Sequence, residues 1–171
     1  MKAITIWQPW ASLIASGAKQ FETRGWETKH RGKIAIHAAK IIPREIGVVD
    51  RSFCHAVQRA LFPNAKDVDM WSNIVQLLPR GAIVAIGDLT ACHLISGRTT
   101  VGPEAVAAQA YVGGKLTDIT TCTNELLFGD WTLGRFAWEL QNVELLETPI
   151  YVTGRQGLWN WEESDDDTAR D

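Results

Sequence analysis

Short segments in which hydrophobic and polar residues alternate run through most of the chain and predict β-strands. The pattern places strands over residues 3–6, 19–24, 33–38, 81–89, 135–146, 149–152 and 158–161. The apolar run over 81–89 is the strongest of these signals and is typical of a central strand. In residues 19–24, Phe21 and Thr23 share one face, whereas Glu22 and Arg24 share the other, which predicts one core face and one polar face.

Helical spacing is confined mainly to the first half of the chain. Pro9 can begin a helix over 9–16, because the first turn needs no amide donor, and Gly17 can end it in a left-handed conformation. Apolar residues at helical spacing predict a second helix over 43–61, and shorter helices are expected over 70–78 and 103–110. Glycines interrupt 96–134, so we expect that segment to be an irregular insertion, either a functional lid or a variable loop.

This order of elements favours an α+β fold, a small mixed β-barrel with helices packed at its ends. A doubly wound parallel sheet needs a helix after nearly every strand, and no helical pattern occurs between residues 135 and 161. Arg24 and Lys33 are expected in adjacent strands joined by a turn over 25–32. We expect one domain over 1–161 and a disordered acidic tail over 162–171.

Composition places the chain among ordinary globular proteins, with 46% hydrophobic and 22% charged residues in 171. The longest apolar run, 82–86, is far shorter than a membrane span, and no secretory core follows Met1, so no membrane partner is expected. Three widely spaced cysteines suggest neither a disulfide framework nor a zinc site, so we expect a reducing, cytoplasmic setting with no metal and no cofactor.

Charge is distributed unevenly along the chain. The net charge is −3, but the last ten residues hold six acids and one arginine, which leaves residues 1–161 with a net charge of +2. Residues 1–44 alone carry eight basic and two acidic residues. This segment is a candidate anion-binding surface, with an ordinary solvated face as the alternative.

Motifs for a serine nucleophile elbow, a phosphate-binding glycine loop, a zinc protease and a dinucleotide fold are all absent. Instead, polar and aromatic residues gather in the first forty positions, where cations could hold phosphates and indole rings could stack on bases. Burial of the tryptophans in the core is the alternative. The candidate ligand-binding residues in this region are Trp7, Gln8, Pro9, Trp10, Arg24, Trp26, His37 and Lys40.

Several blocks of the chain resemble one known family. Residues 17–24, Gly-Ala-Lys-Gln-Phe-Glu-Thr-Arg, resemble the Gly-x-Lys-x-x-Glu-x-Arg signature of the ASCH domain, named for activating signal cointegrator homology. The segments 7–11, 36–40, 81–89, 135–140 and 154–159 are similar, in order, to further blocks of the family. The resemblance spans about residues 3–161, leaving the middle loop and the acidic tail uncovered, and implies a PUA-like β-barrel with a cleft for RNA, a nucleoside or a nucleotide.

The resemblance also implies a possible chemistry. Some ASCH proteins are small amidohydrolases that deacylate N4-acetylcytidine, using a lysine, a threonine three positions later and a glutamate on the central strand, and others are described as ribonucleases. Here Lys19 matches the lysine, Glu22 occupies the threonine position, and Asp88 falls near the acidic position. We expect Lys19, Glu22, Arg24 and Asp88 to line one cleft mouth, with Lys19 reaching out of the barrel as the cationic partner of Asp88.

Three functions therefore remain open at this point. The first is binding of RNA or a modified nucleoside in a basic, tryptophan-lined cleft, where Gln156 would read a base edge and Trp159 would stack on it or, alternatively, plug the barrel end. The second is a hydrolase in which Lys19 stabilises negative charge and Glu22 or Asp88 acts as general base. The third is an interaction domain without a nucleic-acid role, with the acidic tail as its contact.

Overall fold

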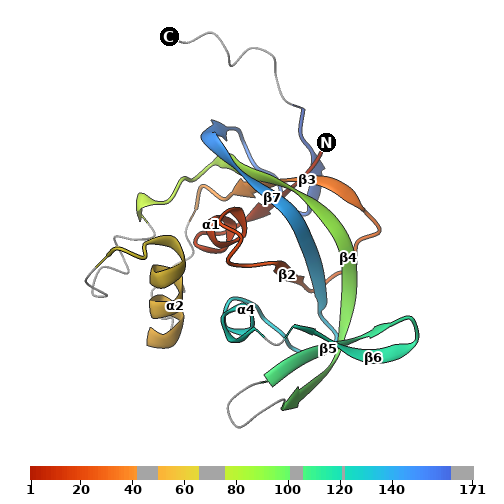
Figure 1. The fold of residues 1–171 in the computed structure, drawn as a ribbon. Helices are drawn as coiled ribbons and strands as arrows, with labels where there is room; N and C mark the ends of the chain where they lie inside the picture. The colour runs from red at the N-terminus through yellow and green to blue at the C-terminus, as the bar shows by residue number, and fades with distance from the viewer. Residues whose placement is uncertain (42–49, 66–75, 101–105, 121, 163–171) are drawn as a thin grey trace, which may run out of the picture.

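A curved mixed β-sheet forms the body of the protein in the computed structural model, which describes residues 1–41, 50–65, 76–100, 106–120 and 122–162 (Figure 1). Its elements occur in the order β1 (Lys2–Ile6), α1 (Trp10–Ala15), β2 (Phe21–Arg24), β3 (Gly32–Ala38), α2 (Arg51–Leu61), β4 (Ala82–Thr100), β5 (Val106–Val112), β6 (Lys115–Thr120), α4 (Thr123–Leu127), β7 (Phe136–Tyr151) and β8 (Leu158–Asn160). The α+β class expected from the sequence is confirmed.

The main sheet has the strand order β2-β7-β4-β3-β1-β8. β1 runs parallel to β3, and the other neighbouring strands are antiparallel. β4 and β7, which contain the expected strands 81–89 and 135–146, are neighbours as predicted, and β7 also absorbs most of the separate strand expected over 149–152. Strand pairing among the described residues forms an open path and does not close into the expected barrel.

The expected neighbourhood of Arg24 and Lys33 is wrong. β2 pairs with β7, while β3 lies between β1 and β4, so two strands separate β2 from β3. The reason is packing, because Phe21 in β2 enters an apolar cluster with Ile95, Trp131 and Ala137. A short connection in sequence favours a hairpin, but burial of this aromatic side chain favours the pairing with β7.

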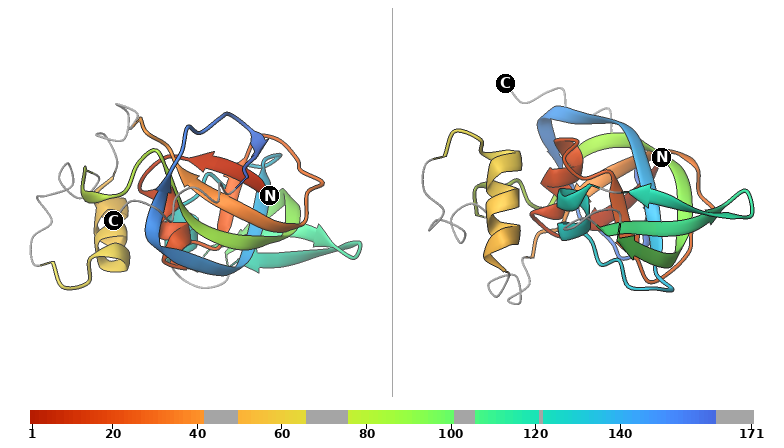
Figure 2. Two further views of the ribbon diagram at one scale, coloured as in Figure 1. Left: turned by 90° about the horizontal axis from the view of Figure 1, so that it is seen from above. Right: turned by 60° about the horizontal axis from the view of Figure 1, so that its bottom comes forward.

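Segments that looked irregular in sequence form a β-arm. β4 continues beyond the main sheet to Thr100 and pairs with β5, which pairs with β6. The helix expected over 103–110 is wrong in its described part, because Val106–Val112 is a strand. In both views of Figure 2 the arm projects on the opposite side of the body from α2.

Helix α1 and the sheet enclose the main core. Ile4, Ile34, Ile36 and Trp138 pack there with Ile14 of α1, all essentially without solvent contact. α1 ends as expected, because Gly17 adopts a φ of +76°, where a side chain would be strained.

Several sequence predictions lie partly outside the described residues. Residues 43–49 of the expected helix 43–61, most of the helix 70–78 and all but the first residue of the acidic tail lie outside the described residues. The described part of the helix expected over 43–61 is confirmed as α2. In the described part of the chain, no helix has both the length and the apolar character needed to span a membrane.

Candidate functional site

An open cleft of about 1380 Å³ lies at one end of the sheet. Its walls come from the end of β1, from β2, from the N-terminal end of α2, from residues 127–130 after α4 and from the connection between β7 and β8. Of the residues singled out from the sequence, those that line it are Trp7, Trp10, Glu22, Arg24, His37, Lys40 and Gln156.

The signature lysine does not reach out of the sheet as expected. Lys19 is 1% exposed, and its Nζ donates a hydrogen bond to the carbonyl oxygen of Phe21. Its carboxylate neighbours are Glu125, 3.7 Å from Nζ, and Glu22, at 4.0 Å. A buried ammonium needs such partners to remain charged. Because its contacts are made inside the protein, Lys19 supports the wall behind the cleft and does not line the cleft.

Glu125 fixes α4 to the free edge of β2. Its carboxylate accepts hydrogen bonds from the backbone amides of Gln20, at 2.6 Å, and Phe21, at 3.1 Å. Burial raises the pKa of Glu125 above its ordinary value, and the charge of Lys19 and the two amides oppose that rise. Backbone donors that would otherwise be unpaired at a sheet edge are thereby satisfied.

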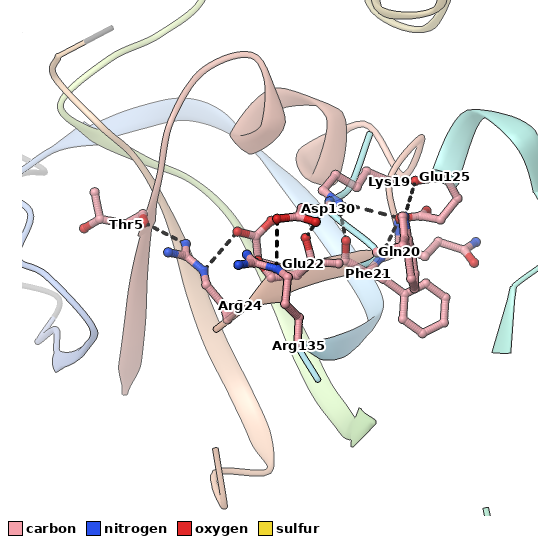
Figure 3. A network of polar contacts seen from close by, with 11 residues as sticks. Thr5, Lys19, Gln20, Phe21, Glu22, Arg24, Glu125, Asp130 and Arg135 are labelled. Atoms are coloured by element: carbon pink, nitrogen blue, oxygen red, sulfur yellow. Dashed lines mark hydrogen bonds and ion pairs between the residues drawn. The ribbon is translucent and has the colours of Figure 1, made fainter. Parts of the chain in front are cut away.

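Glu22 and Arg24 form the floor of the cleft. The Nε of Arg24 lies 3.0 Å from Glu22 Oε1, and its Nη2 donates to the carbonyl oxygen of Thr5 in β1 at 3.1 Å. Polar contacts thus run from Thr5 through Arg24 and Glu22 to Lys19 and Glu125 (Figure 3). The alternation in β2 that placed Glu22 beside Arg24 is confirmed, although Glu22 is mostly buried.

A second carboxylate and guanidinium pair, which the sequence did not indicate, lies on the same side of the cleft. Asp130 Oδ2 is 3.2 Å from Arg135 Nε, and Arg135 Nη2 donates to the carbonyl oxygen of Thr23. The hydroxyl of Thr132, with smaller contributions from its amide and from Arg135, lowers the pKa of Asp130. Figure 3 shows this pair beside Glu22.

Asp88 does not join this cluster. Its carboxylate lies 3.3 Å from Lys33 Nζ and accepts a hydrogen bond from the Asn142 amide at 3.0 Å. That amide, with Lys33, lowers the pKa of Asp88. The expected pairing with Lys19 is therefore wrong. The partners of Asp88 lie in the neighbouring strands β3 and β7, whereas Lys19 precedes β2, which is separated from β4 by β7.

Three exposed cations, Lys40, Arg80 and Arg155, stand at the rim of the cleft. Backbone hydrogen bonds bring the segments of Lys40 and Arg80 together. The amide of Gly81 donates to the carbonyl oxygen of Ala38, and the Gly81 carbonyl accepts from the amide of Val152. Thr5 Oγ1 donates to the carbonyl of Arg155 at 2.8 Å and fixes the third position. Among the described residues, none of these three side chains has a carboxylate within ion-pair distance.

Two aromatic side chains at the cleft are largely exposed: Trp7 is 54% and Tyr151 is 72% accessible. Trp10 also contributes to the wall, but it packs against Phe53 of α2 with ring centroids 5.5 Å apart. Trp26 is not among the lining residues and stands edge-on to Trp138 at 4.6 Å.

Other candidates have structural positions. Gln8 is fully buried, accepts from the amide of Ser12 and donates to the carbonyl of Pro79, while Pro9 occupies the N-cap of α1. Trp159 is also buried, in a core cluster with Ala3, and does not line the cleft, which favours its role as a core plug.

His37 lies at the buried end of the cleft. Its Nε2 is 3.0 Å from the carbonyl oxygen of Val152, and burial lowers its pKa below 6.5 despite that hydrogen bond. A Cβ built on Gly154 would lie 2.5 Å from His37 Nδ1, so only glycine permits this close approach of the β7–β8 connection.

The described residues contain no group of three or more His, Cys, Asp or Glu side chains placed to hold a metal ion. Cys54, Cys92 and Cys122 are free thiols.

The sequence analysis missed Arg80, Asp130, Arg135, Tyr151 and Arg155. Arg155 had a local signal, because it adjoins Gln156 in a block already associated with a ligand. Arg80 and Tyr151 have none, since only the β4–β7 register, which pairs Ala82 with Tyr151, brings their segments together.

Comparison with known proteins identifies a family for this chain. Residues 4–124 match the family model of the ASCH domain. Activating signal cointegrator 1 of Homo sapiens is 36% identical over 91 residues, and the Mus musculus protein is 34% identical over 91 residues. Each alignment covers 52% of this chain, which spans only 14% of the length of these curated relatives. The fold is PUA-like, and the chain belongs to the ASCH domain family.

Proposed function

We propose that this ASCH domain binds RNA, or a nucleoside or nucleotide, in the cleft between β2 and the β7–β8 connection. The observation that carries the proposal is the pairing of three exposed rim cations with exposed aromatic rings, Trp7 and Tyr151, around one opening. Cations of this kind attract phosphates, and flat aromatic faces stack on bases. Gln156, exposed on the same wall, adds an amide that can both donate and accept.

The geometry supports binding better than the hydrolase alternative. Of the three residues assigned to that chemistry, only Glu22 lines the cleft, whereas Lys19 is buried behind it and Asp88 pairs with Lys33 elsewhere. Lys19 Nζ donates to a carbonyl and faces two carboxylates behind the cleft wall, so these contacts hold it away from any substrate in the cleft.

Titration of a fluorescein-labelled single-stranded RNA at low ionic strength, alongside a panel of nucleosides and nucleotides, tests the proposal. We expect saturable binding of at least one of these ligands and its loss in the variant Lys40→Ala/Arg155→Ala. The control replaces two exposed cations outside the cleft, Arg98 and Lys115, with alanine.

The result that would overturn the proposal is the absence of any binding to RNA, nucleoside or nucleotide at low salt. Equal loss in the cleft and control variants would also overturn it, because attraction would then follow total charge and not the cleft. Product analysis after incubation with RNA and N4-acetylcytidine addresses the hydrolase alternative.

A further inference from the structure

The charges of the cleft are arranged by depth. At the floor, Glu22 is mostly buried and neutralises Arg24, whose remaining contact is the backbone of Thr5. At the rim, Lys40, Arg80 and Arg155 are exposed and have no carboxylate partner among the described residues. The floor is therefore locally neutral, whereas the rim, where the exposed Asp50 opposes these three cations, keeps a net positive charge.

This arrangement determines which part of a nucleotide can lie where. A phosphate at the floor would face the Glu22 carboxylate in a partly desolvated site, which costs free energy. A base carries no formal charge and offers N–H donors and carbonyl acceptors, so it can contact both Glu22 and Arg24. Phosphates find unpaired cations at the rim.

The cleft is larger than a pocket for one small molecule. Its volume, about 1380 Å³, exceeds the roughly 300–1,000 Å³ that is usual for small-ligand sites. Its rim cations also come from three separate segments: the residues that follow β3, those that precede β4, and the β7–β8 connection. Cations spread in this way suit successive phosphates of a strand better than a single phosphate.

Trp7 and Tyr151 present ring faces that a duplex cannot use. They are 54% and 72% exposed, and no aromatic ring contact covers either of them within the described part of the chain. Bases in a duplex are already stacked on each other, while bases of a single strand are free to stack on aromatic side chains.

From these observations we infer that the cleft binds a single-stranded stretch of RNA with a base directed to Glu22 and Arg24 and its phosphates on Lys40, Arg80 and Arg155. Trp7 and Tyr151 stack on unpaired bases at the opening. The inference rests on the proposed function and goes beyond it, because it excludes a duplex and a free nucleoside as the preferred ligand and sets the orientation of the strand.

The decisive experiment compares four ligands of the wild-type chain at several salt concentrations. These are a single-stranded RNA of about ten nucleotides, the same sequence as a blunt duplex, the same strand with abasic riboses, and the corresponding mononucleotides. We expect the single strand to bind at least about tenfold more tightly than each of the other three.

Two variants separate the contacts at the rim from those to the bases. Tyr151→Ala should weaken binding of the single strand about tenfold with no change in salt dependence, because stacking carries no charge. Arg80→Ala should reduce the slope of log K against log salt by about 0.7, the value for one phosphate contact on a single strand. Tyr111→Ala and Lys115→Ala, on the exposed β5–β6 arm, are the matched controls and should change neither quantity.

The outcomes distinguish the inference from the proposed function. Equal binding of the duplex, of the abasic strand or of a mononucleotide would overturn the inference while leaving a ligand-binding cleft in place. If neither Tyr151→Ala nor Trp7→Ala changes the affinity for the single strand, the inferred stacking contacts are overturned, while a ligand-binding cleft remains in place. Absence of binding by all four ligands would overturn both.

Discussion

At the scale of single residues, the signature lysine acts in this chain as an internal support. Lys19 and Glu125 are both almost completely buried, and between them they hold β2 and α4 together. Removing one partner of a buried ion pair leaves the other charge without compensation, which costs far more than the pair itself contributes. The lysine can therefore be required for a folded cleft without touching a ligand.

This role predicts a large and coupled loss of stability. Lys19→Met should lower the free energy of unfolding by about 3 kcal/mol, because it leaves the buried Glu125 carboxylate without its cationic partner. In the double variant Lys19→Met/Glu125→Gln the loss should be smaller than the sum of the two single losses. Urea denaturation of all four proteins measures the coupling. Lys33→Met, at the exposed Lys33–Asp88 pair, is the control and should cost less than about 1 kcal/mol.

His37 predicts a pH dependence of stability. Burial lowers its pKa in the folded protein below 6.5, so the unfolded chain binds a proton more readily than the folded chain. Its contribution to stability is complete above pH 6.5 and is lost as the pH falls from 6.5 toward and through the lowered pKa. Urea midpoints between pH 8 and 5 should fall more steeply for the wild type than for His37→Gln. A slope unchanged in His37→Gln would contradict the prediction, and His55→Gln, at an exposed position of α2, is the control.

At the scale of elements, the β7–β8 connection forms one wall of the cleft only because a glycine lets it approach β3. A Cβ on Gly154 would lie 2.5 Å from His37 Nδ1 and 2.9 Å from Thr5 Oγ1. We expect Gly154→Ala to cost about 2 kcal/mol of stability by overpacking and to weaken ligand binding by displacing Arg155. Thermal unfolding and RNA titration measure the two effects. Gly25→Ala, whose Cβ would meet only Arg135 Nη1 at 3.8 Å, should change stability by less than about 0.5 kcal/mol.

Elements were predictable from the sequence where their information is local. The strand at Gly32–Ala38 and the helix ended by Gly17 follow from alternation and from glycine conformation, and both are present. The pairing of β2 with β7 was not predictable, because it depends on Phe21 meeting an apolar cluster from distant segments. The β-arm was missed for a related reason, since its strands lie among glycines and gain their pairing from β4.

The candidate site divides in the same way. Trp7, Arg24, Lys40 and Gln156 line the cleft, in agreement with the expectation that they would bind a ligand together, although their contact with a ligand stays a prediction. Lys19 points inward and pairs with Glu125, which is 106 residues away in sequence, so no local pattern reveals that contact.

At the scale of the whole molecule, the net charge of −3 conceals a mildly basic body. Residues 163–171 hold five acids and one arginine, a net charge of −4, so the chain ending at Glu162 carries +1. Negative charge anywhere on the chain repels a polyanion and slows its approach, and added salt screens the repulsion. The acidic residues 163–171 therefore repel the RNA that the rim cations of the cleft are proposed to attract.

Removal of residues 163–171 should consequently strengthen RNA binding several-fold at low salt. The gain should vanish near 1 M salt, where the Debye length is about 3 Å. Fluorescence titrations of both chains across salt concentrations measure it. The matched variant keeps the chain length and replaces the five acids with asparagine or glutamine. If truncation strengthens RNA binding but neutralisation does not, the segment acts through its size and not its charge. If both variants strengthen binding equally, repulsion from these five acids sets the affinity of the cleft for RNA.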